Sequence, residues 1–254
     1  MTYRVLETRC VVDQAGREQH IRHALSLGLP VCSKSPARDG RLAIVASGPS
    51  VRDYLDELRA FDGEVWAING AYDYLIREGR VPDGFVGLDP QREMVKFLTD
   101  PHIETTFYIA SCSHPDVFDC VRGFDVRLWH SNSDTIRALP AGSYAVPGGI
   151  TCITRAPFLA HLLGWRDVSI YGADCSYHEH PYAYATEARQ CDPNDRTMVV
   201  RVNGHLFRTE LGLMHQASNL GALETVFPAK LTFRCGGMLP EFLKSTRPLE
   251  EFVA

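Results

Sequence analysis

The stretch "LAIVASGPSVRDYL", residues 42–55, decides the fold that we expect for this chain. It begins as a short apolar run, meets Gly48-Pro49-Ser50, and continues with Val51, Tyr54 and Leu55 at helical spacing. A strand that passes through a tight glycine turn into a helix is the first unit of an α/β sheet, and the N–H groups at such a helix start can hold a phosphate. The same turn also fits an ordinary strand–helix junction, so the rest of the chain must decide between the two.

Six further runs are similar to the first: they are short, rich in β-branched or aromatic residues, and mostly continuous, as strands covered on both faces should be. They span residues 64–69, 84–89, 105–112, 126–131, 168–173 and 230–235. Apolar residues at helical spacing lie between them in 50–60, 149–163 and 208–226. Strands that alternate with helices predict an α/β fold, a Rossmann-like three-layer sandwich with a mostly parallel sheet.

The chain divides by pattern into an extension, a domain and a long insertion. We expect residues 1–40 to form a helical extension, with a helix that ends at Gly28, and residues 41–254 to form a single Rossmann-like domain. Residues 175–207 are aromatic and poor in strand signals. An insertion of this length near the C-terminal ends of strands is often a lid or a substrate loop, and we expect that role here.

The composition is that of a globular protein, with 45% hydrophobic and 22% charged residues and a mean hydropathy of -0.14. The net charge of -5 argues against a nucleic-acid partner, because a duplex binder needs a basic face. No apolar run is long enough for a membrane span, and residues 1–10 lack the apolar core of a signal peptide, so we expect a cytoplasmic protein. The oligomeric state stays open.

Eight cysteines lie at positions 10, 32, 112, 120, 152, 175, 191 and 235, with no CxxC pair among them. Several stand inside apolar runs, where cysteine usually acts as a small core residue. We therefore predict reduced, buried thiols rather than a zinc or disulfide framework.

Two glycine turns are candidate phosphate cradles. In the opening turn, Ser50 is a candidate N-cap, with Asp53 three residues later in place of the usual Glu or Gln of a capping box. Gly48 allows close approach of another backbone or of a ligand. A second pair, Gly148-Gly149, opens the helix expected at 149–163 and offers another backbone cradle.

Polar residues end three other expected strands, at Asn69-Gly70, Asp89 and Asp174. Ligands of open α/β sheets bind at the carboxyl ends of the strands. Asn and Asp at these places also cap the helices that follow. Three such ends in one sheet nevertheless favour a binding site.

Three candidate histidines are among those that follow the last of these strand ends. His178 and His180 form a His-x-His near Asp174, which is incomplete as a zinc site and is more typical of a loop that touches substrate. His205 follows Gly204 just before the helix expected at 208–226. An exposed histidine at such a place is either an ordinary surface residue or a candidate base.

Together these stretches resemble the MptE-like Rossmann family, which is named for the archaeal 6-hydroxymethylpterin diphosphokinase and is also found in flagellin-modification proteins. The Gly-Pro-Ser turn, the Asn at the next strand end, "PDGFVGLDP" (82–90) and residues 147–174 carry the resemblance. The resemblance covers roughly residues 40–244 and implies a nucleotide site. For a diphosphokinase it implies ATP, with Asp89 helping to hold Mg²⁺.

The second half also resembles the bacterial sialyltransferases that use CMP-sialic acid. "GADCSYHEHPYAYA" (172–185) is similar to a strand end and loop of that family, and "GHLFRTELGLMHQASNL" (204–220) to its Gly-His segment. The match implies His205 as general base, with Asp174 as a second candidate catalytic residue. The candidate nucleotide-binding positions are Ser47 (an Asn in the sialyltransferases), Gly48, Pro49, Ser50, Asn69, Gly70, Asp89, Gly148 and Gly149. The candidate substrate-loop residues are Tyr177, His178, His180, Tyr182, Tyr184 and Thr209.

Three functions stay open on the sequence. A glycosyltransferase would take a CMP-type nucleotide sugar and a small-molecule acceptor, with His205 as base and helix N-termini stabilising the departing phosphate. A diphosphokinase would transfer pyrophosphate from ATP, with Mg²⁺, to a pterin-like acceptor. A non-catalytic nucleotide-binding module is the third hypothesis. We favour the glycosyltransferase.

Overall fold

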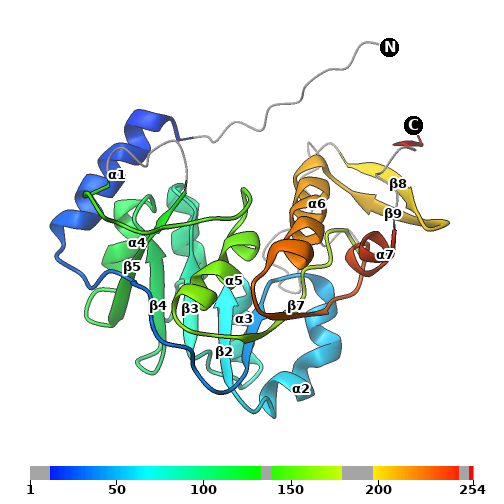
Figure 1. Ribbon diagram of the computed structural model, residues 1–254, viewed down its shortest axis with the longest axis horizontal. Coiled ribbons are helices and arrows are strands. Elements are labelled where there is room, and N and C mark those ends of the chain that lie inside the picture. The colour runs from blue at the N-terminus through cyan, green and yellow to red at the C-terminus, as the bar shows by residue number, and fades with distance from the viewer. Residues whose placement is uncertain (1–11, 133–138, 179–196, 246–251, 254) are drawn as a thin grey trace.

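A computed structural model describes residues 12–132, 139–178, 197–245 and 252–253. Its centre is an eight-stranded sheet with the strand order β10-β7-β1-β2-β3-β4-β5-β6, and every pair of neighbours is parallel (Figure 1). The strands are β1 Leu42–Val45, β2 Glu64–Ile68, β3 Gly84–Gly87, β4 Thr106–Ala110, β5 Asp125–Ser131, β6 Ala145–Val146, β7 Asp167–Tyr171 and β10 Lys230–Arg234. The seven strands expected from apolar runs are all present, and the predicted α/β sandwich is confirmed.

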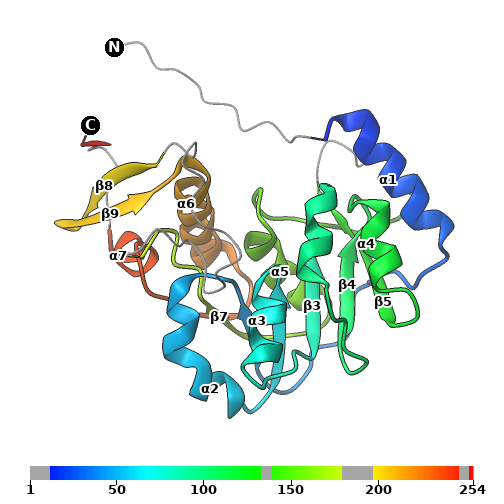
Figure 2. The ribbon, with the colours of Figure 1, turned by 180° about the vertical axis from the view of Figure 1, so that it is seen from behind.

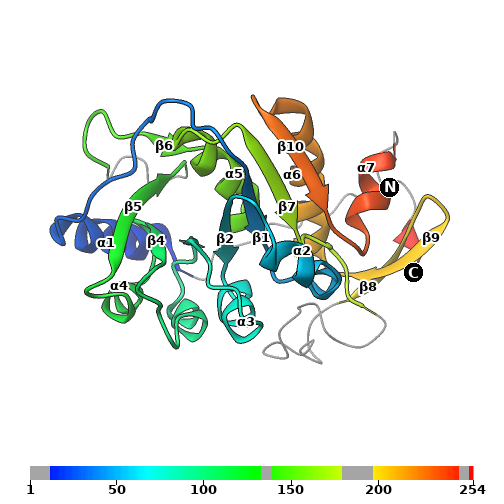
Figure 3. The same ribbon diagram turned by 90° about the horizontal axis from the view of Figure 1, so that it is seen from below.

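Helices cover both faces of this sheet, as the view from below shows (Figure 3). One face carries α3 (Ala71–Arg77) and α4 (Pro115–Cys120), and the other carries α5 (Cys152–Leu162) and α6 (Leu211–Val226). Alternate residues of β1 enter the two hydrophobic cores: Ala43 and Val45 face α3 and α4, whereas Leu42 and Ile44 face α5 and α6. Burial on both faces explains why these strands are continuously apolar in the sequence.

The remaining helical elements are α1 Gln14–Ser26, α2 Leu55–Arg59, α7 Leu239–Lys244 and the 3₁₀ helices η1 Pro49–Tyr54 and η2 Arg92–Phe97. Of these, η1, α2 and η2 pack into the core on the α3 and α4 face through Val51, Leu58 and Met94, and α7 packs on the α5 and α6 face through Leu239. The segment after α1 covers the edge of β5, because Cys32 N–H donates to Leu128 O and Leu128 N–H donates to Pro30 O. Gly28, with φ +65°, follows the end of α1 as predicted. Among the helices of the described residues, none combines the length and apolar character needed to cross a membrane.

The insertion expected at 175–207 contains an antiparallel hairpin, which corrects the prediction that it is poor in strands. β8 (Met198–Val202) pairs with β9 (His205–Thr209), and β11 (Phe252–Val253) pairs with β8. Asn203 and Gly204 form the two-residue turn, and both have positive φ, which is the Asn-Gly hairpin signal. Figures 1 and 2 place this hairpin beside α6 and α7, at one end of the sheet. Residues 179–196 lie outside the described residues, so the lid stays a prediction.

The helix predicted at 208–226 accordingly begins three residues later, at Leu211, because residues 205–209 belong to β9. The helix predicted at 149–163 begins at Cys152, because Gly148-Gly149 form an irregular turn before it. Of the cysteines that the structure describes, all six are free thiols and five are buried, as predicted. Cys10 and Cys191 lie outside the described residues.

The order of strands reverses once, between β1 and β7. From β1 the chain adds β2 to β6 on one side, and it then returns through α5 to place β7 and β10 on the other side of β1. The two connections leave β1 and β7 in opposite directions, which opens a crevice at their carboxyl ends. This switch point is where a ligand site is expected in a sheet of this kind.

Candidate functional site

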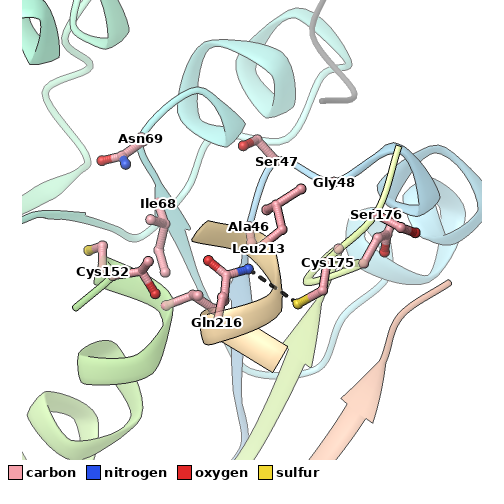
Figure 4. Close-up of a pocket in the computed structure, with 14 residues that line it drawn as sticks. Ala46, Ser47, Gly48, Ile68, Asn69, Cys152, Cys175, Ser176, Leu213 and Gln216 are labelled. Carbon is pink, nitrogen blue, oxygen red and sulfur yellow. Dashed lines mark hydrogen bonds between the residues drawn. The ribbon is translucent and has the colours of Figure 1, made fainter. Parts of the chain in front are cut away.

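A pocket with a volume of about 170 Å³ lies at this switch point (Figure 4). The carboxyl ends of β1, β2 and β7, the start of α5 and one face of α6 form its walls. Its lining residues are Ala46, Ser47, Gly48, Ile68, Asn69, Thr151, Cys152, Ile153, Gly172, Asp174, Cys175, Ser176, Leu213 and Gln216. Of the sequence-predicted nucleotide residues, Ser47, Gly48 and Asn69 line it, and so does Asp174.

The Gly-Pro-Ser turn uses its own N–H groups within the protein. Gly48 N–H donates to Gly172 O at 2.8 Å, Ser50 N–H donates to Asp174 Oδ2 at 2.8 Å, and Val51 N–H donates to Gly48 O. The Ser50 hydroxyl donates to Asp174 Oδ1 rather than capping a helix, and no side chain caps η1. The expected capping box of Ser50 and Asp53 is therefore wrong, and the turn does not present the amides of Gly48 and Ser50 to a phosphate.

Close approach explains Gly48 without a ligand. A Cβ atom at this position would lie 2.2 Å from Gly172 O and 2.9 Å from Asp174 Cγ, although φ is an ordinary -64°. The ends of β1 and β7 are thus packed backbone against backbone, and only glycine fits between them. Pro49 and Ser50, which follow, are not among the lining residues of the pocket.

Asp174, which lines the pocket, joins three segments of the chain. Its carboxylate accepts from Ser50 N–H, the Ser50 hydroxyl and Gly236 N–H, and its carbonyl oxygen accepts from Met238 N–H and Leu239 N–H. The side chain is only 4% exposed, and this burial raises the pKa of the carboxyl, while the bonds from Ser50 and Gly236 oppose the rise. With its oxygens occupied by protein donors, Asp174 holds β1, β7 and the segment before α7 together.

Two pocket residues adopt a backbone conformation that is rare outside glycine. Asn69 has φ +49° and Cys175 has φ +56°. Such conformations recur at functional sites, where the surroundings hold them in place. Asn69 Oδ1 is buried and has no hydrogen-bond partner among the described residues. A buried acceptor of this kind is satisfied when a ligand or water donates to it.

Gln216 forms the α6 wall of the pocket. Its Nε2 donates to Cys175 Sγ at 3.5 Å, and its amide oxygen points away from Cys175, toward the side of Ile68 and Asn69 (Figure 4). Ser176 and Leu213 complete this side. Gln216, Ser176 and Cys175 are not among the residues predicted from the sequence. Gln216 stands in the middle of an apolar helix, and Cys175 and Ser176 follow Asp174, the polar residue at the strand end that the pattern singles out.

The start of α5 supplies the pocket with uncapped amides. Thr151 occupies the N-cap position, but its side chain does not accept from the helix, and its hydroxyl lies 3.3 Å from Thr154 Oγ1 instead. Thr151, Cys152 and Ile153 all line the pocket. The first N–H groups of an α-helix attract negative charge through both hydrogen bonding and the helix dipole. This helix end lines the pocket, whereas the glycine pair before it does not.

Gly148 and Gly149 have packing roles that the cradle hypothesis did not anticipate. A Cβ at Gly148, where φ is +130°, would lie 2.6 Å from Thr154 O, and one at Gly149 would lie 2.6 Å from Asn219 Nδ2. Both glycines therefore let the chain pass close to α5 and α6. Neither is a lining residue of the pocket.

Gly70 and Asp89 also lie outside the pocket lining. Gly70 is the N-cap of α3 and is buried. Asp89 accepts from Gln91 N–H at 2.9 Å, and its charge helps to raise the pKa of the Cys152 thiol, which burial chiefly raises. Asp89 is thus close to the α5 side of the pocket. The described residues contain no cluster of three metal-ligating side chains, so the expected magnesium site with Asp89 stays a hypothesis.

His205 does not lie in the pocket. It begins β9 on the exposed hairpin, beside Phe207, and it contributes to the lowered pKa of Glu241, whose main cause is the bond from Lys244. The expectation that it stands just before a helix is corrected by the intervening strand. The hairpin meets the pocket wall through Thr209, whose buried hydroxyl donates to Cys175 O at 2.9 Å.

Tyr177 and His178 continue the segment that lines the pocket. Tyr177 is buried, its N–H donates to Arg208 O, and its hydroxyl bonds Glu210 at 3.1 Å, so it anchors the hairpin rather than facing a substrate. His178 is exposed two residues beyond the pocket-lining Ser176. His180, Tyr182 and Tyr184, the other candidate substrate-loop residues, lie outside the described residues.

The fold and the site define a Rossmann-like α/β protein with a pocket at the switch point of a parallel sheet. The family model described as 6-hydroxymethylpterin diphosphokinase MptE-like matches residues 30–180, and the chain belongs to this family. A solved structure of similar fold is the MAf glycosyltransferase from Magnetospirillum magneticum AMB-1, with a TM-score of 0.65 and 15% identity. The similarity covers 96% of this chain and 40% of that one, so the chain spans less than half of its length. No curated protein sequence matches the chain.

Proposed function

We propose that this protein is a nucleotide-dependent transferase that moves a glycosyl group from a nucleoside-monophosphate sugar of the CMP type to a small-molecule acceptor. The make-up of the pocket carries this proposal: an uncapped helix N-terminus and the amides of Asn69 and Gln216 line it, and no Lys or Arg does. The lining carboxylate, Asp174, has its oxygens occupied by donors from Ser50 and Gly236. A single phosphate suits one helix end, whereas a triphosphate needs several cations or a metal cluster. Membership of the MptE-like family and the glycosyltransferase of similar fold are consistent with a nucleotide-related transferase.

The chemistry assigned to the pocket is a displacement at the anomeric carbon. The acceptor hydroxyl oxygen bonds to that carbon, the bond from the carbon to the phosphate oxygen breaks, and its electron pair leaves with the nucleoside monophosphate. The N–H groups at the start of α5 stabilise the negative charge on the departing phosphate. Asn69 and Gln216 offer amide oxygens to hydroxyl or amino groups of the donor.

The acceptor proton needs a base, and the geometry favours His178 over His205. The Cα atoms of His178 and the pocket-lining Ser176 are two residues apart and so within about 8 Å of each other. His205 is on the hairpin and outside the pocket lining. We expect His178→Ala to lower turnover at least 100-fold with nucleotide affinity kept within about twofold, as is typical for loss of a general base. Loss of turnover in His205→Ala instead would return the role to His205.

Calorimetric titration with CMP tests the binding step. Asn69→Gly removes the amide and keeps a backbone that tolerates positive φ, and we expect it to weaken CMP at least tenfold, since one lost hydrogen bond is worth about 1.4 kcal/mol. Asn203→Gly is the matched control, because Asn203 has φ +48° but lies in the hairpin turn. If wild type does not bind CMP, or if both variants bind it equally well, the proposal is wrong.

A diphosphokinase is the second candidate, because the matching family model bears that description and Asp89 is close to the α5 side of the pocket. It would bind ATP only with Mg²⁺ and would lose that binding in Asp89→Asn. Metal-independent binding of CMP, with no binding of ATP and Mg²⁺, would decide for the glycosyl transfer.

A further inference from the structure

Arg155 is a buried cation behind the pocket wall. It stands in α5, three residues after the pocket-lining Cys152, and only 8% of it is exposed. Its Nη1 donates to Val146 O at 2.9 Å and its Nη2 donates to Asn132 O at 3.0 Å. Its buried Nε has no partner, and no carboxylate of the described residues forms an ion pair with it.

This position is electrostatically unfavourable in the empty protein. A guanidinium away from water needs a negative partner, and two neutral carbonyl oxygens compensate its charge only in part. The charge also stands in the first turns of α5, at the positive end of the helix dipole, where a cation is destabilising. Burial lowers the pKa of Arg155, in line with a charge that the surroundings do not balance.

The field of this charge reaches the pocket wall. Burial raises the pKa of the Cys152 thiol, and the Arg155 charge acts against that rise. Cys152 is a lining residue and the first residue of α5. The charge of Asp89 acts on the same thiol in the opposite sense, but less strongly than Arg155. The helix end and the buried guanidinium therefore leave a positive potential on this side of the pocket, which an anion placed there would balance.

We propose that Arg155 is a positioning residue that holds the anionic group of the ligand at the start of α5, acting through its charge across the pocket wall rather than by contact. This inference rests on the proposed function, and it deepens it: the phosphate of a nucleoside monophosphate, and not its nucleoside, is what Arg155 recognises. A clamp role for Arg155, through its bonds to Val146 and Asn132, is the alternative. A clamp would act on every ligand of the pocket alike.

Two substitutions separate charge from clamp, with CMP and cytidine as probes in the same titration. Arg155→Lys keeps the charge and loses the fork geometry, whereas Arg155→Gln loses the charge and keeps a donor for a carbonyl. We expect Arg155→Gln to weaken CMP roughly tenfold, as for the loss of one unit-charge interaction through the protein at an effective dielectric constant near 20, and to leave cytidine unchanged. Arg155→Lys should bind CMP with an affinity within about threefold of wild type, because the lysine keeps the positive charge.

The outcomes distinguish this inference from the proposed function. Equal weakening of CMP and cytidine binding in both variants would show that Arg155 acts as a clamp. CMP binding by Arg155→Gln as tight as in wild type would show that the Arg155 charge does not affect binding. Either result overturns the inference and leaves the proposed function intact. Absence of CMP binding in wild type would overturn the proposed function itself. Thermal unfolding checks that each variant folds. If Arg155→Gln does not fold, tight CMP binding by Arg155→Lys supports the role of the Arg155 charge. Weak binding of both CMP and cytidine by Arg155→Lys refutes that role.

Discussion

Replacing Gly48 by alanine should destabilise the fold, and the size of the effect follows from the junction of β1 and β7. The added Cβ would lie 2.2 Å from Gly172 O, so the two backbones must separate by roughly 1 Å to reach an ordinary contact. That movement would stretch the bonds of Gly48 N–H to Gly172 O and of Ser50 N–H to Asp174 Oδ2, both 2.8 Å long, beyond hydrogen-bond distance. Losing one neutral and one carboxylate-assisted bond amounts to about 3–4 kcal/mol.

Urea unfolding, followed by circular dichroism and tryptophan fluorescence, measures this loss. Gly212→Ala is the matched control: Gly212 is the second residue of α6, and a Cβ there meets only Glu210 Oε1 at 3.8 Å. Because alanine is the better helix former, we expect the control to gain up to about 1 kcal/mol. A loss of less than about 1 kcal/mol in Gly48→Ala would refute the reasoning, since such a loss fits a single weakened bond. If that variant stayed stable but lost CMP binding, Gly48 would serve a ligand instead.

Three further predictions concern Ser50, the buried His130 and two buried thiols. Ser50→Ala removes the hydrogen bond from the Ser50 hydroxyl to Asp174 and should lower the free energy of unfolding by about 1.5–3 kcal/mol. In the same urea assay, Ser47→Ala should change it by less than about 0.5 kcal/mol, and equal effects of the two variants would contradict the role of Asp174. Burial lowers the pKa of His130, which is 1% exposed, so below about pH 6.5 the unfolded chain binds more protons than the folded protein. The free energy of unfolding should therefore fall as the pH drops below about 6.5, by at most about 1.4 kcal/mol per pH unit for this group. Thermal unfolding from pH 8 to pH 5 should show a smaller fall in His130→Gln than in wild type. Burial raises the pKa of the thiols of Cys32 and Cys175 to about 12. After iodoacetamide treatment at pH 8, mass spectrometry should therefore find both thiols unmodified in the native protein and modified in urea. Rapid modification in the native protein would show that the structure around these thiols opens to solvent.

The sheet was predictable from the sequence because each central strand is buried on both faces. A continuous apolar run such as 42–47 then has one main interpretation once helical patterns flank it. The hairpin was not predicted although Asn203-Gly204 is its strongest local signal, because the aromatic and polar composition of the whole segment 175–207 is typical of a loop. The signal that predicts this hairpin is therefore local and present in the sequence.

The site was predictable only where it follows from strand ends. Asn69 and Asp174 end strands, and parallel strands bring their carboxyl ends to one edge, so both could be placed at a common site. Gln216 and Thr151 come from helices, whose rotation and height depend on packing against the sheet. The true partner of Ser50 is 124 residues away, and a local capping rule could not find it.

The Gly-Pro-Ser turn therefore has a different part in the site from the one that its sequence indicates. Its glycine fits the backbone of β7, its serine bonds to Asp174, and both N–H groups are used within the protein. What it contributes is rigidity: it fixes β1 against β7, and the pocket opens where these two strands separate. The place that we propose for the anion is the start of α5, with Arg155 in the same helix. A nucleotide bound here would thus have its phosphate at the second helix start of the sequence pattern and not at the first.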